Sequence, residues 1–107
     1  MTFDINEVLA NMLSAIKDVV SENWNLVKET ANDFLQSRKE RLELLTSLRL
    51  QDQISEDFFE QRLEDEKNIL ESELHAIAII SKVTAQNAAN AAIAVLENAV
   101  KTALGVL

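Results

Sequence analysis

The chain has 107 residues, with 18 acidic and 10 basic side chains, a formal net charge of −8, one glycine, and neither proline nor cysteine. The lack of cysteine excludes disulfides and thiolate metal sites. The scarcity of glycine and proline disfavours sheets with tight turns, so we predict one all-α domain over residues 1–107. The excess of acidic residues disfavours binding to a phosphate backbone, so we expect no nucleic-acid partner.

The beginning of the chain indicates a cytoplasmic protein. Met1-Thr2-Phe3-Asp4 has neither the basic nor the apolar region of a signal peptide.

The first predicted helix covers about residues 5–50. Asp4 and Glu7 have the spacing of a capping box at its start. Apolar residues then recur at heptad spacing in three adjacent rows, which make a stripe wider than a two-stranded seam. These rows are Leu13, Val20, Val27 and Phe34; Leu9 and Ile16; and Ile5, Met12, Val19 and Leu26.

A kink near residues 21–24 is the one alternative to a continuous first helix. Ser21-Glu22-Asn23 interrupts one apolar row, but the other rows keep their phase across it, and this favours continuity. Trp24 is expected in the core or in an interface.

A turn is predicted at residues 51–54, followed by a second helix over about residues 55–104. Ser55 has the chemistry of an N-cap, and acidic residues fill the next turn. The residues assigned to the turn and its cap are Asp52, Gln53, Ile54 and Ser55.

Charge patterns on the two sides of this turn predict a long antiparallel helical hairpin. If residue i lies opposite residue 105 − i, the basic stretch 36–49 faces the acidic stretch 56–73. Arg41 would then face Glu64, and Lys39 would face Glu66, as exposed ion pairs that select the register.

Residues 74–107 form an alanine-rich arm with only three charges, Lys82, Glu97 and Lys101, and Gly105 is predicted to end its helix. The uncharged run 83–96 is shorter than the roughly 20 apolar residues that span a bilayer. Docking of residues 74–107 on a membrane or lipid surface is kept as an alternative function.

A single long hairpin would leave an extended apolar surface in water, which favours a homo-oligomer, a dimer or higher, built as a four-helix or larger bundle. The alternative is a compact monomer with kinks near 21–24 and 72–76. The interface is predicted near the chain ends, away from the charged turn, at Leu9, Met12, Leu13, Ile16, Val20, Trp24, Val27, Ile77, Ile80, Ala89, Ile93, Leu96 and Val100.

No catalytic or cofactor-binding set emerges from the sequence. Glu71 and His75, four residues apart, are the candidates for a metal-binding bundle, but Ser72 stands where a Glu-x-x-His motif needs its glutamate. We therefore predict a non-enzymatic structural or interaction protein. It would self-associate through its C-terminal helix and the N-terminal half of its first helix, leaving the charged turn end for a further protein partner.

Overall fold

A computed structural model describes residues 3–105 of the chain. Within them are four α-helices: α1 (Ile5–Val20), α2 (Trp24–Leu50), α3 (Glu56–His75) and α4 (Lys82–Leu104). A short 3₁₀ turn, η1 (Ser21–Asn23), separates α1 from α2. The described residues contain no strand, so the all-α prediction is confirmed for this part of the chain.

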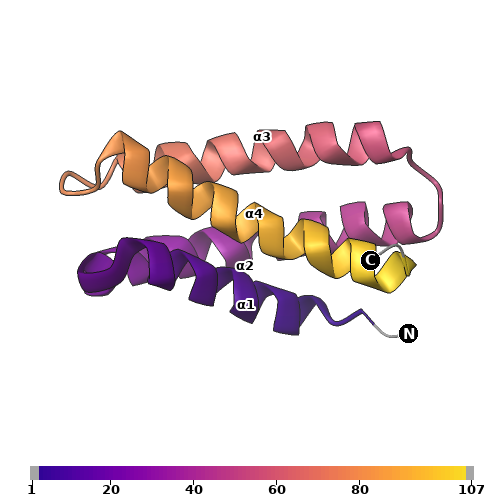
Figure 1. The fold of residues 1–107 in the computed structure, drawn as a ribbon, viewed down its shortest axis with the longest axis horizontal. Helices are drawn as coiled ribbons and strands as arrows, with labels where there is room; N and C mark the ends of the chain where they lie inside the picture. The colour runs from indigo at the N-terminus through magenta and orange to yellow at the C-terminus, as the bar shows by residue number, and fades with distance from the viewer. Residues whose placement is uncertain (1–2, 106–107) are drawn as a thin grey trace.

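The four helices lie side by side in a bundle of 41 × 24 × 22 Å. The chain reverses direction at each of its three connections, which brings the first helix next to the last (Figure 1). The most extensive contact in the bundle joins α1 and α4.

The core draws on every helix. Met12, Ile16, Phe34, Leu63 and Leu96 are among its largest side chains, each no more than 2% exposed. The α4 helix contributes small residues, which allow close approach of neighbouring backbones. These fully buried alanines are Ala85, Ala88, Ala89 and Ala92.

The first predicted helix is broken at Ser21. This residue has φ 56° and ψ −117°, the geometry of the first central position of a type II′ turn, where glycine is the usual residue. The backbone N–H of Ser21 still donates to the carbonyl of Lys17, and the chain then turns back into α2. The preference for one continuous helix over residues 5–50 is therefore wrong.

The second predicted helix is broken as well. The α3 helix ends at His75, and α4 begins after Ser81, whose hydroxyl oxygen accepts a hydrogen bond from the backbone N–H of Thr84 at 3.1 Å. Between them, residues 76–81 form a short connection in which Ile80 is buried. The break lies just beyond the kink considered at 72–76.

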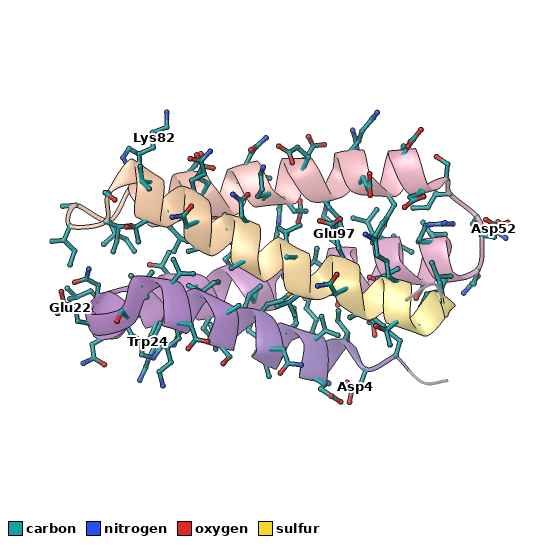
Figure 2. All side chains as sticks on the ribbon, viewed as in Figure 1. Asp4, Glu22, Trp24, Asp52, Lys82 and Glu97 are labelled. Carbon is teal, nitrogen blue, oxygen red and sulfur yellow. The ribbon has the colours of Figure 1, made fainter. Side chains whose placement is uncertain are left out.

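These two breaks change which parts of the chain lie at the same end of the molecule. The sequence placed the chain ends and the charged turn at opposite ends of a rod. In the bundle, the start of α1, the end of α4 and the α2–α3 turn share one end, and both breaks lie at the other (Figure 1). In Figure 2, Asp4 and Asp52 lie toward the first of these ends, and Glu22 and Lys82 toward the second.

Local chemistry fixes the helix ends. The carboxylate of Asp4 accepts hydrogen bonds from the backbone N–H groups of Asn6 and Glu7, at 2.9 and 3.4 Å. At the other end of the chain, Gly105 adopts a left-handed conformation with φ 74° and ends α4, as predicted. Ser55 caps α3 through a hydrogen bond from the backbone N–H of Phe58.

The turn after α2 is a Schellman motif. The N–H of Gln53 donates to the carbonyl of Leu48 at 2.8 Å, and the N–H of Asp52 donates to that of Arg49 at 3.1 Å. Asp52 takes the left-handed position with φ 58°, where glycine is more usual. The Arg49 guanidinium spans the turn by donating to the carbonyl of Ile54 and to the carboxylate of Asp52.

Candidate interaction surface

The residues predicted to form an oligomer interface lie inside or at the edge of the chain's own bundle. Ten are buried: Leu9, Met12, Ile16, Val20, Val27, Ile80, Ala89, Ile93, Leu96 and Val100. Leu13, Trp24 and Ile77 are half-buried. In this fold the apolar rows find their partners within one chain, because the breaks at Ser21 and at residues 76–81 bring α1 and α4 back against α2 and α3.

The two metal candidates do not acquire further ligands. Glu71 is half-buried and His75 exposed, both on the last turns of α3. Among residues 3–105, no group of three or more histidine, aspartate or glutamate side chains is arranged to hold a metal ion.

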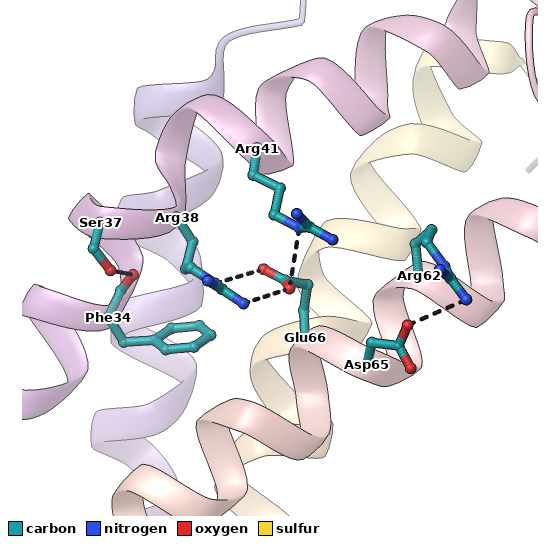
Figure 3. A network of polar contacts seen from close by, with 7 residues as sticks. All are labelled: Phe34, Ser37, Arg38, Arg41, Arg62, Asp65 and Glu66. Atoms are coloured by element: carbon teal, nitrogen blue, oxygen red, sulfur yellow. Dashed lines mark hydrogen bonds and ion pairs between the residues drawn. The ribbon is translucent and has the colours of Figure 1, made fainter.

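A buried ion pair joins α2 to α3. Glu66 is 1% exposed, and its two oxygens accept hydrogen bonds from Nε and Nη2 of Arg38, at 3.0 and 2.9 Å (Figure 3). Arg41 adds a third contact, with its Nε 3.4 Å from Glu66 Oε2. The sequence paired Glu66 with Lys39 and Arg41 with Glu64, as exposed pairs. The structure instead gives Glu66 two arginines and buries its carboxylate.

Beside this pair, one side of α3 carries a mixed row of side chains. The Arg62 guanidinium lies 5.2 Å from the centre of the Phe58 ring, and its Nη2 is 3.2 Å from Asp65 Oδ2. Ile69 follows Asp65 by four residues, so it extends the same row by one turn. The opposite side of α3 faces a groove toward α4, lined by Glu60 and other residues. The row from Phe58 to Ile69 is therefore on the side of α2.

Exposed leucines lie on the matching side of α2. Leu44 follows Arg41 by three residues and is 59% exposed. Leu26 is 61% exposed and lies 18 residues earlier, which is five full helical turns and hence the same side of the helix. We call the surface formed by Leu26, Leu44, Phe58 and Ile69 the α2/α3 face. Phe58 and Ile69 are 45% and 38% exposed.

The α2/α3 face combines apolar side chains with opposite charges on its two helices. The second half of α2 is basic, with Arg38, Lys39, Arg41 and Arg49. Between residues 56 and 73, α3 carries eight acidic residues and only two basic ones. Figure 3 views the molecule from this side, with α2 and α3 in front of the other two helices.

A second feature is a shallow groove of about 170 Å³ near the turn end, between α3 and α4. Phe59, Val100 and Leu104 contribute apolar groups, and charged side chains surround them. These charged residues are Arg49, Glu56, Glu60, Glu97 and Lys101. The groove carries three acidic and two basic side chains, so it presents no strong excess of one charge to a ligand.

The α2/α3 face was not identified from the sequence. Its signal is available in the spacing of Leu26 and Leu44, but the sequence prediction places Leu26 in an inward-facing apolar row and gives Leu44 no role. The sequence predicts that the basic stretch of α2 pairs with the acidic stretch of α3 and that the charged turn end is left for a further protein partner, but it does not identify exposed apolar side chains beside these charges.

None of the helices in residues 3–105 combines the length and the apolar character needed to cross a bilayer. No family model, curated protein or solved structure matches the chain, so its function is argued from its own geometry.

Proposed function

We propose that the protein is a non-enzymatic structural or interaction protein that self-associates through its α2/α3 face. The observation that carries this proposal is that four large apolar side chains are exposed on one side of the bundle, two on each helix: Leu26, Leu44, Phe58 and Ile69. Large exposed apolar side chains gathered on one face of a small domain and bordered by polar residues commonly mark a contact with another protein.

The charges of the face favour a second copy as the partner. The basic stretch of α2 and the acidic stretch of α3 lie side by side, so the face is complementary to itself if each α2 meets the partner's α3. A twofold axis parallel to the helices produces this pairing. An axis across the helices would instead place basic α2 on basic α2.

The sequence-predicted interface is replaced in this proposal. Its side chains contribute to the bundle core, whereas the α2/α3 face is available without any change of fold. The expected class of function, self-association without catalysis, is kept.

The test is the molecular mass in solution as a function of concentration, measured by light scattering after size exclusion. Leu44→Glu and Ile69→Glu should each weaken association at least about tenfold, because a charge would be buried at an apolar contact. Val83→Glu is the matched control, since Val83 is 64% exposed but lies on α4. Wild-type protein that stays monomeric throughout would refute the proposal, as would equal effects of all three variants.

Cysteine crosslinking tests the orientation, because the natural chain has no cysteine. With the axis parallel to the helices, Leu44 and the partner's Phe58 lie toward the same end. A mixture of Leu44→Cys and Phe58→Cys chains should therefore form a mixed disulfide dimer. Leu26→Cys mixed with Phe58→Cys should not, because these residues lie at opposite ends of the bundle.

A lipid-surface role is the second candidate, and it rests on the tip of the bundle. Ile79 and Val83 are 53% and 64% exposed and flank Lys82 at the α3–α4 connection. Apolar side chains beside a lysine suit shallow insertion at a lipid headgroup boundary. Flotation with liposomes should then be abolished by a combined Ile79→Glu and Val83→Glu variant and left unchanged by Leu44→Glu.

A further inference from the structure

We propose that the chain also forms a domain-swapped dimer, in which two copies exchange their α1/α4 pairs. The exchange opens the two connections at residues 21–23 and 76–81 and leaves the α2–α3 turn closed. This assembly does not depend on the α2/α3 face, which stays on the outside of the swapped dimer.

The positions of the two connections make the exchange geometrically simple. Both lie at the same end of the bundle, and together they are the only covalent links between the α1/α4 pair and the α2/α3 pair in residues 3–105 (Figure 1). Opening them together swings one helix pair away from the other as a unit. The extensive contact between α1 and α4 is retained in the process.

The first connection is strained in the closed form. Ser21 holds a backbone conformation that favours glycine, with φ 56° and ψ −117°. In a straight helix the same residue would adopt ordinary helical angles. Neither proline nor glycine occurs between Val20 and Trp24, so the segment has no residue that prevents a continuous helix.

The second connection is close to helical at its start. Ala76 has φ −66° and ψ −17°, and its N–H donates to the carbonyl of Ser72 as in an α-helix. The α-helical pattern stops at this point, and α4 begins only after its N-cap Ser81, whose hydroxyl oxygen accepts from the N–H of Thr84. Residues 76–81 also contain neither glycine nor proline. Short connections of this kind promote exchange between copies when they open.

An open chain can pair with a second open chain and cover the surfaces that opening exposes. With both connections straightened, α1 continues α2 and α4 continues α3, giving a hairpin of about 70 Å for residues 5–50 at 1.5 Å per residue. Two such hairpins in antiparallel orientation place α1 of each copy on α2 of the other. The contacts of α1 with α2, and of α4 with α2 and α3, are then rebuilt between chains, while the α1–α4 and α2–α3 contacts stay within each chain. Residues such as Met12, Ile16 and Leu96 can therefore bury the same surfaces as in the monomer.

Substitutions at the two connections test the exchange because they should shift the equilibrium between monomer and swapped dimer in opposite directions. Ser21→Gly removes the strain of the closed form and weakens the straight helix, so it should favour the monomer. The double variant Ser21→Ala with Ser81→Ala keeps the strain, removes the cap of α4 and strengthens the straight helix, so it should favour the dimer. We expect the ratio of closed to open chains to differ about tenfold between the two variants. Because two chains must open to form one dimer, their dimerisation constants should differ about 100-fold.

All variants should carry Ile69→Glu, so that association through the α2/α3 face is removed and the two proposals fail separately. Each protein is refolded from denaturant at high concentration, and its helicity is checked by circular dichroism. The dimer is then isolated by size exclusion and its length measured by X-ray scattering. A swapped dimer should approach the 70 Å expected for the open hairpin, against 41 Å for the longest dimension of the bundle.

The proposal is overturned if the alanine double variant remains a monomer with a radius of gyration near 13.6 Å after refolding. It is also overturned if Ser21→Gly and the alanine variant dimerise to the same extent. A dimer that forms without Ile69→Glu and disappears with it would likewise overturn the exchange, because it would depend on the α2/α3 face alone.

Discussion

Glu66 places a carboxylate in the interior of the contact between α2 and α3. It is 1% exposed, while the Arg38 side chain that forks onto it is 29% exposed. Such a pair contributes little net stability, because the loss of hydration of both groups offsets most of their attraction. Its stronger effect is on specificity, since a shift of the helices would leave the carboxylate without its arginine.

Removal of Arg38, the partner of a buried carboxylate, should therefore be far more damaging than removal of the partner of an exposed carboxylate. Arg38→Ala should lower the free energy of unfolding by about 3 kcal/mol, because Glu66 would keep only the longer contact with Arg41. Lys67→Ala is the control: Lys67 pairs with Glu64 along α3 at 2.8 Å, and its loss should cost less than about 1 kcal/mol. Urea unfolding followed by circular dichroism measures both, and similar losses would contradict the assigned role of Glu66.

At the scale of helices, the sequence predicts well what local chemistry controls. Asp4, Ser55 and Gly105 end or begin helices through hydrogen bonds and backbone angles that involve only near neighbours. The approximate register of α2 on α3 also followed from charge, although Glu66 pairs with Arg38 and Arg41 rather than with Lys39. A one-turn ambiguity is inherent in long side chains, because arginines three residues apart reach the same carboxylate.

The buried alanines of α4 should not tolerate replacement by larger residues. Ala89 is fully buried, so Ala89→Leu should overpack the core and lower the free energy of unfolding by about 1–3 kcal/mol. Ala94 lies on the exposed side of the same helix, and Ala94→Leu should change it by no more than about 0.5 kcal/mol. Thermal and urea unfolding of the two variants compares them directly. Equal effects would mean that α4 is not held closely against its neighbours.

For the whole molecule, the folding back of the chain could not be predicted from the apolar pattern. Two of the three heptad rows keep their phase through Ser21, and a row buried against a second copy has the same residues as a row buried against its own chain. The choice depends on two short segments without glycine or proline. Ser21 adopts a glycine-like conformation there, and the interruption of one apolar row at Ser21-Glu22-Asn23 is the only sign of it in the sequence.

The net charge of −8 should make the stability depend on salt. At about 0.01 M the screening length is roughly 30 Å, comparable with the bundle, and at about 0.15 M it is roughly 8 Å. Because folding concentrates the negative charge, added NaCl over this range should raise the melting temperature. Replacing the exposed acids Glu29 and Glu43 with Gln should reduce that rise. A melting temperature that is constant or falls with salt would contradict self-repulsion as the dominant effect.

The extensive contact between the first and last helices has a consequence for biosynthesis. While the ribosome is still making α4, α1 has no surface on which to complete its packing, although its own residues were made first. The α2–α3 turn closes a local contact, whereas the α1–α4 contact must join distant parts of the chain. Until α4 emerges, the apolar side of α1 stays available to chaperones or to the α1 helix of a neighbouring nascent chain.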